Sequence, residues 1–124
     1  MERRTLSPRQ LQVMEILWDA DEGMTASAIV KANENLQINT VQASLRSLIA
    51  KNYVKVGDIV YSGTVLSRSY LPLVSREEYL EMSCQRLAQI SSPEAIVTSL
   101  VNGETDIAVL EDLEKMIQKR KKEL

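Results

Sequence analysis

The stretch Asn39-Thr40-Val41-Gln42-Ala43-Ser44-Leu45-Arg46-Ser47-Leu48-Ile49-Ala50-Lys51 predicts a short helix with two different faces. One face is an apolar stripe at helical spacing, made of Val41, Leu45, Leu48 and Ile49. Asn39 is expected to cap this helix, and Gln42, three residues later, to close a capping box. The other face holds small or hydrogen-bonding side chains, a single arginine and no acid: Thr40, Gln42, Ala43, Ser44, Arg46 and Ser47.

An outer face without carboxylates is unusual for a helix that meets only solvent, since such faces commonly mix Glu and Lys four residues apart. It suits the major groove of DNA, where base edges offer hydrogen-bonding atoms and phosphates repel acids. The alternative is an ordinary surface helix, and on this helix alone both interpretations stay open. Arg46 is likewise either a base or phosphate contact or a solvated side chain.

Two further helices are expected before this stretch. Ser7 and Pro8, followed by Gln10, are typical of a helix start, and that helix runs to about Asp19 before Asp21-Glu22-Gly23 breaks it. Thr25 is expected to cap a shorter helix that ends near residue 32. Two short helices joined by a turn, the second with a hydrogen-bonding outer face, form the helix-turn-helix pattern.

A β-hairpin is expected next. Residues 53–61 and 64–71 are rich in β-branched and aromatic side chains, Ser62-Gly63 is a turn signal, and Pro72 ends the second strand. Three helices followed by a hairpin predict a winged helix over residues 1–74. In this hairpin Arg68 is expected to contact phosphate or the minor groove, or to stay solvated. Lys51, between the helix and the hairpin, is expected to face the DNA backbone or solvent.

Residues 75–124 predict three short amphipathic helices. Ser75 with Glu78 is a capping box, Ser92-Pro93 marks the next start, and Thr105 or Asp106 caps the last helix. Fifty residues arranged in this way bury little apolar surface by themselves. Their apolar faces therefore need a partner, either the first domain or a second copy of the chain. The expected fold is mainly α with a small β-hairpin.

Composition excludes most catalytic chemistry. The 124 residues carry a net charge of −2, with one cysteine and no histidine. Histidine-based catalysis, a Cys/His metal site and an internal disulfide are therefore absent, and no glycine-rich phosphate loop occurs. We expect no enzyme, no metal and no cofactor. No apolar run approaches membrane-spanning length, so no contact with a lipid membrane is expected, and the single cysteine favours a reducing cytoplasmic setting.

Charge is unevenly divided between the two halves. Residues 1–74 hold eight Lys and Arg against seven Asp and Glu, and residues 75–124 hold seven against ten. The less acidic half is the one that contains the candidate reading helix, which gives weak support to nucleic-acid binding. Trp18 is expected in the core, and Cys84 as a small buried apolar residue on its helix.

The order of these features resembles the penicillinase repressor family of winged-helix regulators (BlaI/MecI/CopY type). The resemblance rests on Leu6-Ser7-Pro8 before a helix that contains Ile16-Leu17-Trp18, on the Thr40-Val41…Leu45…Leu48…Lys51 spacing, and on the Tyr53-Val54 strand. It covers nearly the whole chain. It implies a bacterial homodimeric repressor whose residues 1–74 bind a pseudo-palindromic operator and whose residues 75–124 dimerise, controlling β-lactam resistance or a related stress response.

The resemblance also implies site residues. The recognition positions map to Asn39, Thr40 and Gln42, with Ala43 and Arg46 beside them. Lys51 and Arg68, which come from the residue patterns above and not from the resemblance, complete the expected DNA contacts. The dimerisation residues are expected to be Tyr79, Leu87, Ile96, Leu100, Leu110, Leu113 and Ile117. Gln42 stands where members often carry arginine, so a different operator sequence is expected.

Other departures from the family concern the hairpin and the inducing signal. The hairpin is longer by several residues around Ile59 to Leu66. The copper-responsive branch has a C-terminal cysteine cluster that this chain lacks. In the penicillinase branch a membrane metalloprotease sensor cuts an Asn-Phe bond, but this chain has no phenylalanine, and the best-aligned pair is Ser99-Leu100. The competing function is a winged-helix module that docks onto proteins without sequence-specific DNA binding.

Overall fold

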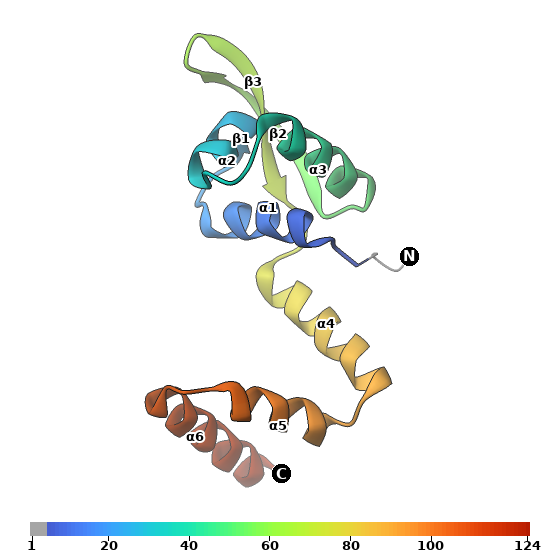
Figure 1. The fold of residues 1–124 in the computed structure, drawn as a ribbon, viewed down its shortest axis with the longest axis vertical. Coiled ribbons are helices and arrows are strands. Elements are labelled where there is room, and N and C mark those ends of the chain that lie inside the picture. The colour runs from blue at the N-terminus through green and yellow to red at the C-terminus, as the bar shows by residue number, and fades with distance from the viewer. Residues whose placement is uncertain (1–4) are drawn as a thin grey trace. The chain divides into compact units, whose positions relative to one another are not determined.

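The computed structural model describes residues 5–124 and confirms a mainly α fold with a small sheet (Figure 1). Residues 1–4, which open the expected domain 1–74, lie outside the described residues. The elements in chain order are α1 (Pro8–Asp19), β1 (Met24–Thr25), α2 (Ala26–Ala32), α3 (Ile38–Ala50), β2 (Val54–Ser62), β3 (Val65–Pro72), α4 (Arg76–Ile90), α5 (Pro93–Gly103) and α6 (Ile107–Glu123).

Most helices begin at the side chains that the sequence indicates. The Ser7 hydroxyl accepts a hydrogen bond from the Gln10 backbone N–H, and the Gln10 side chain accepts one from the Ser7 N–H, which completes a capping box. Thr25 caps α2, Ser92 caps α5, and Asp106 rather than Thr105 caps α6. Each of these bonds satisfies an N–H of the first turn that has no partner within its helix.

The start of α3 differs from the prediction. Gln37 occupies the cap position without a side-chain hydrogen bond, and Asn39 lies inside the first turn, so the expected capping box at Asn39 and Gln42 was wrong. The helix is instead placed by burial, because Leu36 and Val41 on either side of its start lie in the core. Packing outside the helix therefore decides where α3 begins.

The buried stripe of α3 is also shifted by one position. Val41, Leu45 and Leu48 are buried as predicted, but Ser44, expected on the outer face, is buried with them. Ile49, expected in the stripe, is more than one-third exposed. The neighbouring elements accept a small hydroxyl side chain on one flank of α3 and leave the opposite flank open.

The three strands form an antiparallel sheet in the order β1-β3-β2. The two-residue strand β1 pairs Met24 with Tyr70 and Thr25 with Ser69, and was not predicted because two residues carry no periodicity. The hairpin of β2 and β3 turns at Gly63, whose φ of 67° is open to glycine without strain.

A bulge interrupts the hairpin. Val56 pairs with Tyr70 and Ile59 with Arg68, so β2 advances one residue more than β3. The Ser69 hydroxyl donates a 2.7 Å hydrogen bond to the Asp58 carbonyl at this point. A Cβ on Gly57 would lie 3.0 Å from the Ser69 Oγ, which explains why glycine stands there. The bulge separates an inner hairpin, packed on the helices, from the outer hairpin of residues 59–68.

The chain divides into two compact units, one ending at Leu80 and the other comprising Glu81–Leu124. The core of the first unit includes Val13, Met14 and Leu17 from α1, Ile29 from α2, the buried stripe of α3, and Tyr53, Val54 and Val74. The sequence-based boundary after residue 74 precedes the first turn of α4, whereas in the structure this turn packs with the first unit.

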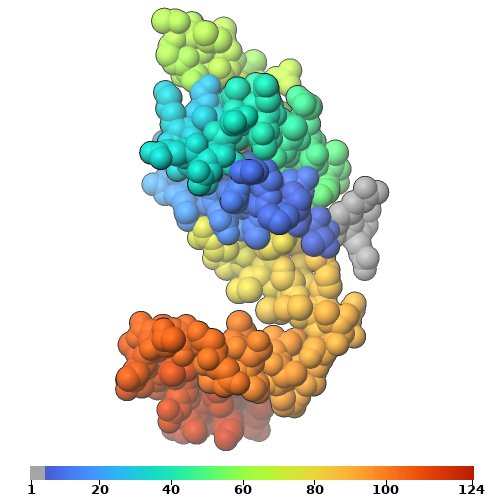
Figure 2. Space-filling view, viewed as in Figure 1, coloured from blue at the N-terminus to red at the C-terminus, as the bar shows by residue number. Residues whose placement is uncertain are grey.

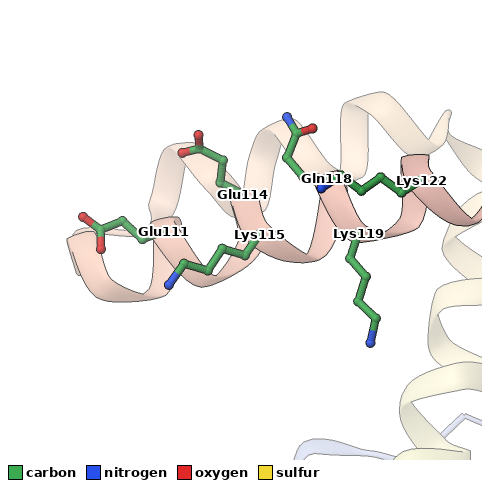
Figure 3. A pocket seen from close by; sticks show the side chains of 6 residues that line it. All are labelled: Glu111, Glu114, Lys115, Gln118, Lys119 and Lys122. Carbon is green, nitrogen blue, oxygen red and sulfur yellow. The ribbon is translucent and has the colours of Figure 1, made fainter.

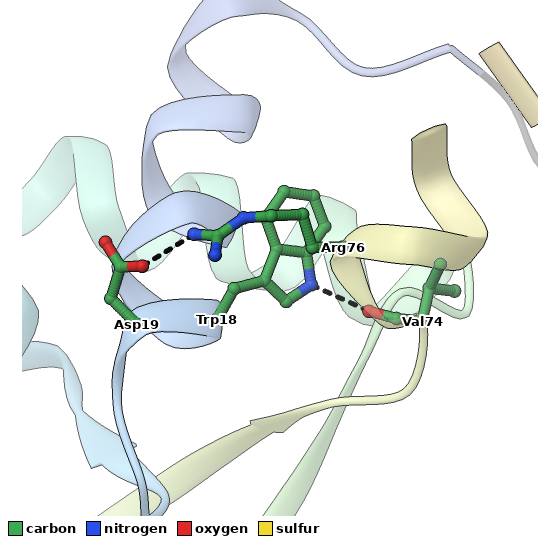
Figure 4. Close-up of polar contacts among 4 residues, drawn as sticks. All are labelled: Trp18, Asp19, Val74 and Arg76. Atoms are coloured by element: carbon green, nitrogen blue, oxygen red, sulfur yellow. Dashed lines mark hydrogen bonds and ion pairs between the residues drawn. The ribbon is translucent and has the colours of Figure 1, made fainter. Parts of the chain in front are cut away.

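Trp18 connects the end of α1 to the start of α4 (Figure 4). Its indole Nε1 donates a 2.8 Å hydrogen bond to the Val74 carbonyl. The guanidinium carbon of Arg76 lies 5.6 Å from the centroid of the Trp18 ring, and its Nη2 is 2.6 Å from the Asp19 carboxylate. This hydrogen bond to Asp19 raises the pKa of Arg76 above its usual value. Trp18 is thus a half-buried connector rather than a fully buried core residue.

Tyr79 continues this aromatic contact. Its ring centroid lies 5.7 Å from that of Trp18 and 6.1 Å from that of Tyr53, in tilted and edge-on arrangements. Such geometries are favourable for aromatic pairs. The first turn of α4 is therefore part of the packing of the first unit.

Replacing Trp18 by phenylalanine should reduce the free energy of unfolding by at least about 1 kcal/mol, because the hydrogen bond to the Val74 carbonyl is lost and the smaller phenyl ring keeps only part of the packing. Urea unfolding followed by far-UV circular dichroism, at one fixed protein concentration, measures this change. Tyr61→Phe is the control, since Tyr61 is 73% exposed. Equal unfolding midpoints for the two variants would contradict a stabilising role of the Trp18 hydrogen bond.

Candidate nucleic-acid interface

The exposed side of α3 carries five of the predicted contact residues. Asn39, Gln42, Ala43 and Arg46 are exposed and Thr40 is half-buried, opposite the stripe that packs into the core. The helix presents amides, a hydroxyl and a guanidinium on a rigid support, and its sequence contains no acid. These groups include the donors and acceptors that read base edges.

The C-terminal end of α3 is closed by a left-handed residue. Asn52 has φ of 64°, its N–H bonds to the Ile49 carbonyl, and the Tyr53 N–H bonds to the Leu48 carbonyl at 2.9 Å. These two backbone hydrogen bonds form a Schellman motif. Asparagine is among the few residues that tolerate the left-handed conformation that the motif requires. The motif ends α3 and turns the chain so that Tyr53 enters the core at the start of β2.

Lys51 lies apart from the other predicted contacts. Its ammonium donates to the Thr5 carbonyl at 3.1 Å and to the Gln10 Oε1 at 2.8 Å, at the beginning of α1. The half-buried side chain thereby joins the two ends of α1 and α3 that meet there. The structure places Lys51 as a connector between helices, and sequence spacing gave no sign of partners more than forty residues away.

A hollow of about 280 Å³ lies between α3 and the hairpin of β2 and β3, which is the wing of this winged helix. Gln42 of α3 and Arg68 of β3 line it together, so the structure brings together two predicted contacts that are far apart in the sequence. Ser27 of α2 and Tyr70 of β3 line the same hollow and were missed by sequence reasoning. Tyr70 was detectable in principle, because it lies two residues from Arg68 and strand residues two apart share a face.

Charge supports the same surface. Residues 35–75, which contain α3 and the hairpin, hold four Lys and Arg and only one acid, Asp58. The net charge of residues 1–74 as a whole does not show this excess of basic residues, because acids cluster in α1 and in the turn after it. Lys51 is bonded at the start of α1. The other three basic residues, Arg46, Lys55 and Arg68, exceed the single acid by two positive charges, which attract the phosphate backbone.

The predicted dimerisation residues differ in their surroundings. Tyr79 packs within the first unit, as described above, and leaves six residues of that set in the second. In the single chain Leu87, Leu100 and Ile117 are exposed, and Ile96, Leu110 and Leu113 are half-buried. No residue of α4, α5 or α6 is fully buried. These three helices retain the unsatisfied apolar faces that the sequence indicates.

Two other sequence-based assignments fall in the second unit. Cys84 was expected to be buried, but it is exposed, because the rest of the chain does not cover the face of α4 on which it lies. Ser99 and Leu100, the pair aligned with the family cleavage site, are both exposed within α5. Cleavage between them stays a prediction.

Charged side chains on α6 are ordered along the helix (Figure 3). A shallow hollow of about 520 Å³ is lined, from the N-terminal to the C-terminal end, by Glu111, Glu114, Lys115, Gln118, Lys119 and Lys122. The acids come first and the lysines follow. Each half of this face is therefore complementary to the other half of an antiparallel copy.

Other classes of site are not found in the part of the chain that the structure describes. Among residues 5–124 there is no cluster of three or more side chains able to hold a metal ion. No helix in this range has the length and apolar character needed to cross a membrane.

A family model described as penicillinase repressor matches residues 6–119. The chain belongs to the penicillinase repressor family. The match spans both units, so the three C-terminal helices are part of the family pattern as well as the winged helix. Family membership makes this protein a regulator of transcription and not an enzyme.

The chain is also similar to several solved structures at low sequence identity. The chain is similar to a possible transcriptional regulator from Methanosarcina mazei Go1, with 22% identity, a TM-score of 0.50 and 81% of each chain covered. It is similar to the MarR of Staphylococcus aureus in complex with salicylate and kanamycin, with 16% identity, a TM-score of 0.48, and 94% of this chain and 71% of that chain covered. It is also similar to the adhesin competence repressor of Streptococcus pyogenes, with 13% identity, a TM-score of 0.46, and 96% and 80% covered. At such identities the likeness concerns the fold alone. No curated protein matches the chain significantly.

The contacts of Lys51 lead to a test. Lys51→Met should lower the free energy of unfolding by about 1 kcal/mol, because both hydrogen bonds to the start of α1 disappear. Lys55→Met removes the same charge from an exposed position four residues later and should change the free energy of unfolding by less than about 0.5 kcal/mol. Thermal unfolding of the two variants compares them directly. A loss of stability in Lys55→Met that is as large as or larger than the loss in Lys51→Met would show that the Lys51 hydrogen bonds do not hold α1 and α3 together.

Proposed function

We propose that the protein is a homodimeric repressor that binds a pseudo-palindromic operator by inserting α3 into the major groove. The observation that carries the proposal is the acid-free exposed face of α3, with Asn39, Gln42 and Arg46 on it, in a chain of the penicillinase repressor family. The hollow shared with Arg68 extends this surface onto the wing.

The side chains on α3 suggest which bases are read. Asn and Gln form paired hydrogen bonds with adenine, and Arg does so with guanine. Gln42 stands where members of the family often carry arginine. We therefore expect an adenine in the half-site at the position that an arginine would read as guanine, and a guanine or a phosphate opposite Arg46.

Dimerisation is supported by the second unit. Its helices have exposed apolar side chains and no buried residue, which is costly for an isolated monomer. The acid-then-base order along α6 suits an antiparallel pairing of two copies about a twofold axis. Two linked reading helices then contact half-sites about one DNA turn apart, and their linkage raises affinity over a single contact.

The family also suggests how repression ends and where the protein acts. We include in the proposal a cytoplasmic repressor of β-lactam resistance or a related stress response, released by a membrane metalloprotease sensor that cuts the second unit. The candidate bond joins Ser99 and Leu100, and Leu100 lies against the partner in the proposed dimer, so this interface has to open before a protease reaches the bond. The bond lies inside a helix, so α5 has to unwind locally before it fits a protease cleft.

The competing function is docking onto another protein without sequence-specific DNA binding. It is favoured by one observation, the exposed apolar side chains of the outer hairpin. Salt separates the two functions, since binding dominated by phosphate contacts weakens steeply with salt and an apolar protein contact does not.

Selection of bound duplexes from a random DNA library, at near-physiological salt, tests the proposal. The expected result is a twofold symmetric motif with half-sites about one turn apart. On the selected operator, Arg46→Ala should weaken binding by about tenfold or more. Arg9→Ala, which removes the same charge from the exposed face of α1, is the control. A folded dimer that enriches no motif would contradict operator binding.

Leu100→Asp should dissociate the dimer at micromolar concentration, because a carboxylate at this 69% exposed apolar position cannot be buried against a partner. Ser99→Asp adds the same charge at the neighbouring residue, away from the apolar side of α5, and should leave the dimer intact. Sedimentation velocity measures both. A wild-type chain that sediments as a monomer would contradict the dimer itself.

A further inference from the structure

The outer hairpin exposes large apolar side chains that the proposed function has not used. Ile59, Tyr61 and Leu66 are 66%, 73% and 60% exposed, and Val65 at the turn is 63% exposed. Between Ile59 and Ser67 the sequence has no charged residue. Contiguous exposed apolar surface of this kind commonly marks a binding site.

Strand register divides these side chains between two faces. Ile59 lies opposite Arg68 and Tyr61 lies opposite Leu66, and directly opposite residues in an antiparallel pair share a face. We call the set Ile59, Tyr61, Leu66 and Arg68 the inner wing face. All four residues belong to the outer hairpin. The other face carries Val60, Ser62, Val65 and Ser67.

The inner wing face continues the surface of the reading helix. Arg68 and Tyr70, two residues apart on β3, share a strand face, and both line the hollow with Gln42 of α3 and Ser27 of α2. Ser67, which precedes Arg68 and belongs to the other face, lines the hollow as well, so two of the three β3 residues at the hollow lie on the strand face of Arg68. Beyond Arg68 the same face leads to Leu66 and to Tyr61 opposite it. The outer hairpin projects past α2 and α3 (Figures 1 and 2). DNA held against Gln42 of α3 would therefore lie next to Arg68, where the inner wing face begins.

The composition of the face matches a minor groove better than a protein surface in this position. The walls of the minor groove are deoxyribose rings, which accept apolar contacts, and its rims are phosphates, which attract the guanidinium of Arg68. No acid follows Asp58 before Glu77, so nothing on the outer hairpin repels the backbone. Aliphatic side chains that enter this groove act as wedges between base steps.

Size adds a constraint. A minor groove is about 6 Å wide, and two paired strands are about 5 Å apart before their side chains are counted. The hairpin therefore fits only if the groove opens. Opening is easiest at flexible pyrimidine–purine steps such as TA, and is resisted by G·C-rich sequence.

We propose that the inner wing face enters the minor groove flanking each half-site and opens it, with Leu66 and Ile59 as the wedge and Arg68 at the phosphate rim. This inference rests on the proposed operator binding. It makes the outer hairpin a specificity element that selects deformable flanking sequence without reading bases. Arg68 contributes charge, and the aliphatic residues contribute the deformation.

The test uses the full-length dimer and the operator selected by the wild-type protein, with TA steps or G·C pairs placed in the flanks. Leu66→Ser should weaken binding to the TA-flanked operator by about tenfold and abolish the preference over G·C flanks. Val65→Ser is the matched control, because its side chain is equally exposed on the adjacent residue and belongs to the other face. It should retain affinity within about twofold and keep the preference.

Two further measurements test how the outer hairpin acts on the operator. The bend of the operator, measured by energy transfer between end labels, should fall in Leu66→Ser and stay in Val65→Ser. The salt dependence of affinity should be unchanged in Leu66→Ser, because no charge is lost. Arg68→Gln should reduce the salt slope by about two, because the dimer loses one phosphate contact at each of its two half-sites.

The outcomes separate the two levels of the proposal. A wild-type dimer that selects no operator would overturn operator binding and this inference together. An operator-binding dimer whose flank preference and bend are the same in Leu66→Ser and in the wild type would overturn the inference alone. That result would assign the inner wing face to a protein partner. Equal losses in Leu66→Ser and Val65→Ser would also overturn it, since the effect would not depend on the face.

Discussion

The burial of one side of α3 is the constraint on which the rest of the first unit depends. Val41, Leu45 and Leu48 are almost completely removed from solvent. With this side fixed, helical geometry leaves Asn39, Gln42 and Arg46 pointing outward, and neither end of α3 can turn without exposing the core. The Schellman motif at Asn52 then directs the chain into the sheet. The reading face is therefore a consequence of packing on its opposite side.

Local signals in the sequence predicted the features that local interactions determine. The capping hydrogen bonds of α1 and α2, the turn at Gly63 and the end of β3 at Pro72 each involve residues within a few positions of one another. The winged-helix class and the exposed contact residues of α3 follow from these elements and their order. Hydrophobic periodicity located the helices because burial and spacing are directly related.

The features that sequence reasoning missed involve contacts between distant residues. Lys51 bonds to residues at the start of α1, and Tyr79 packs on Trp18, across separations that spacing does not reveal. Ser44 and Ile49 exchanged roles because neighbouring elements decide which flank of a helix is covered. Cys84 and the other α4–α6 residues were judged by amphipathicity alone, which shows that a face needs covering and does not show what covers it.

The outer hairpin has a further consequence for the protein when it is not bound to DNA. β2 is an edge strand, and its outer half together with β3 presents uncharged, β-prone sequence to solvent. Such edges are templates for pairing between chains and for aggregation. Asp58 and Arg68 flank the segment in the manner of gatekeeper residues, which limit this tendency by charge. The long wing therefore limits the concentration at which the DNA-free protein stays soluble, because above it the exposed strands of different chains pair and aggregate.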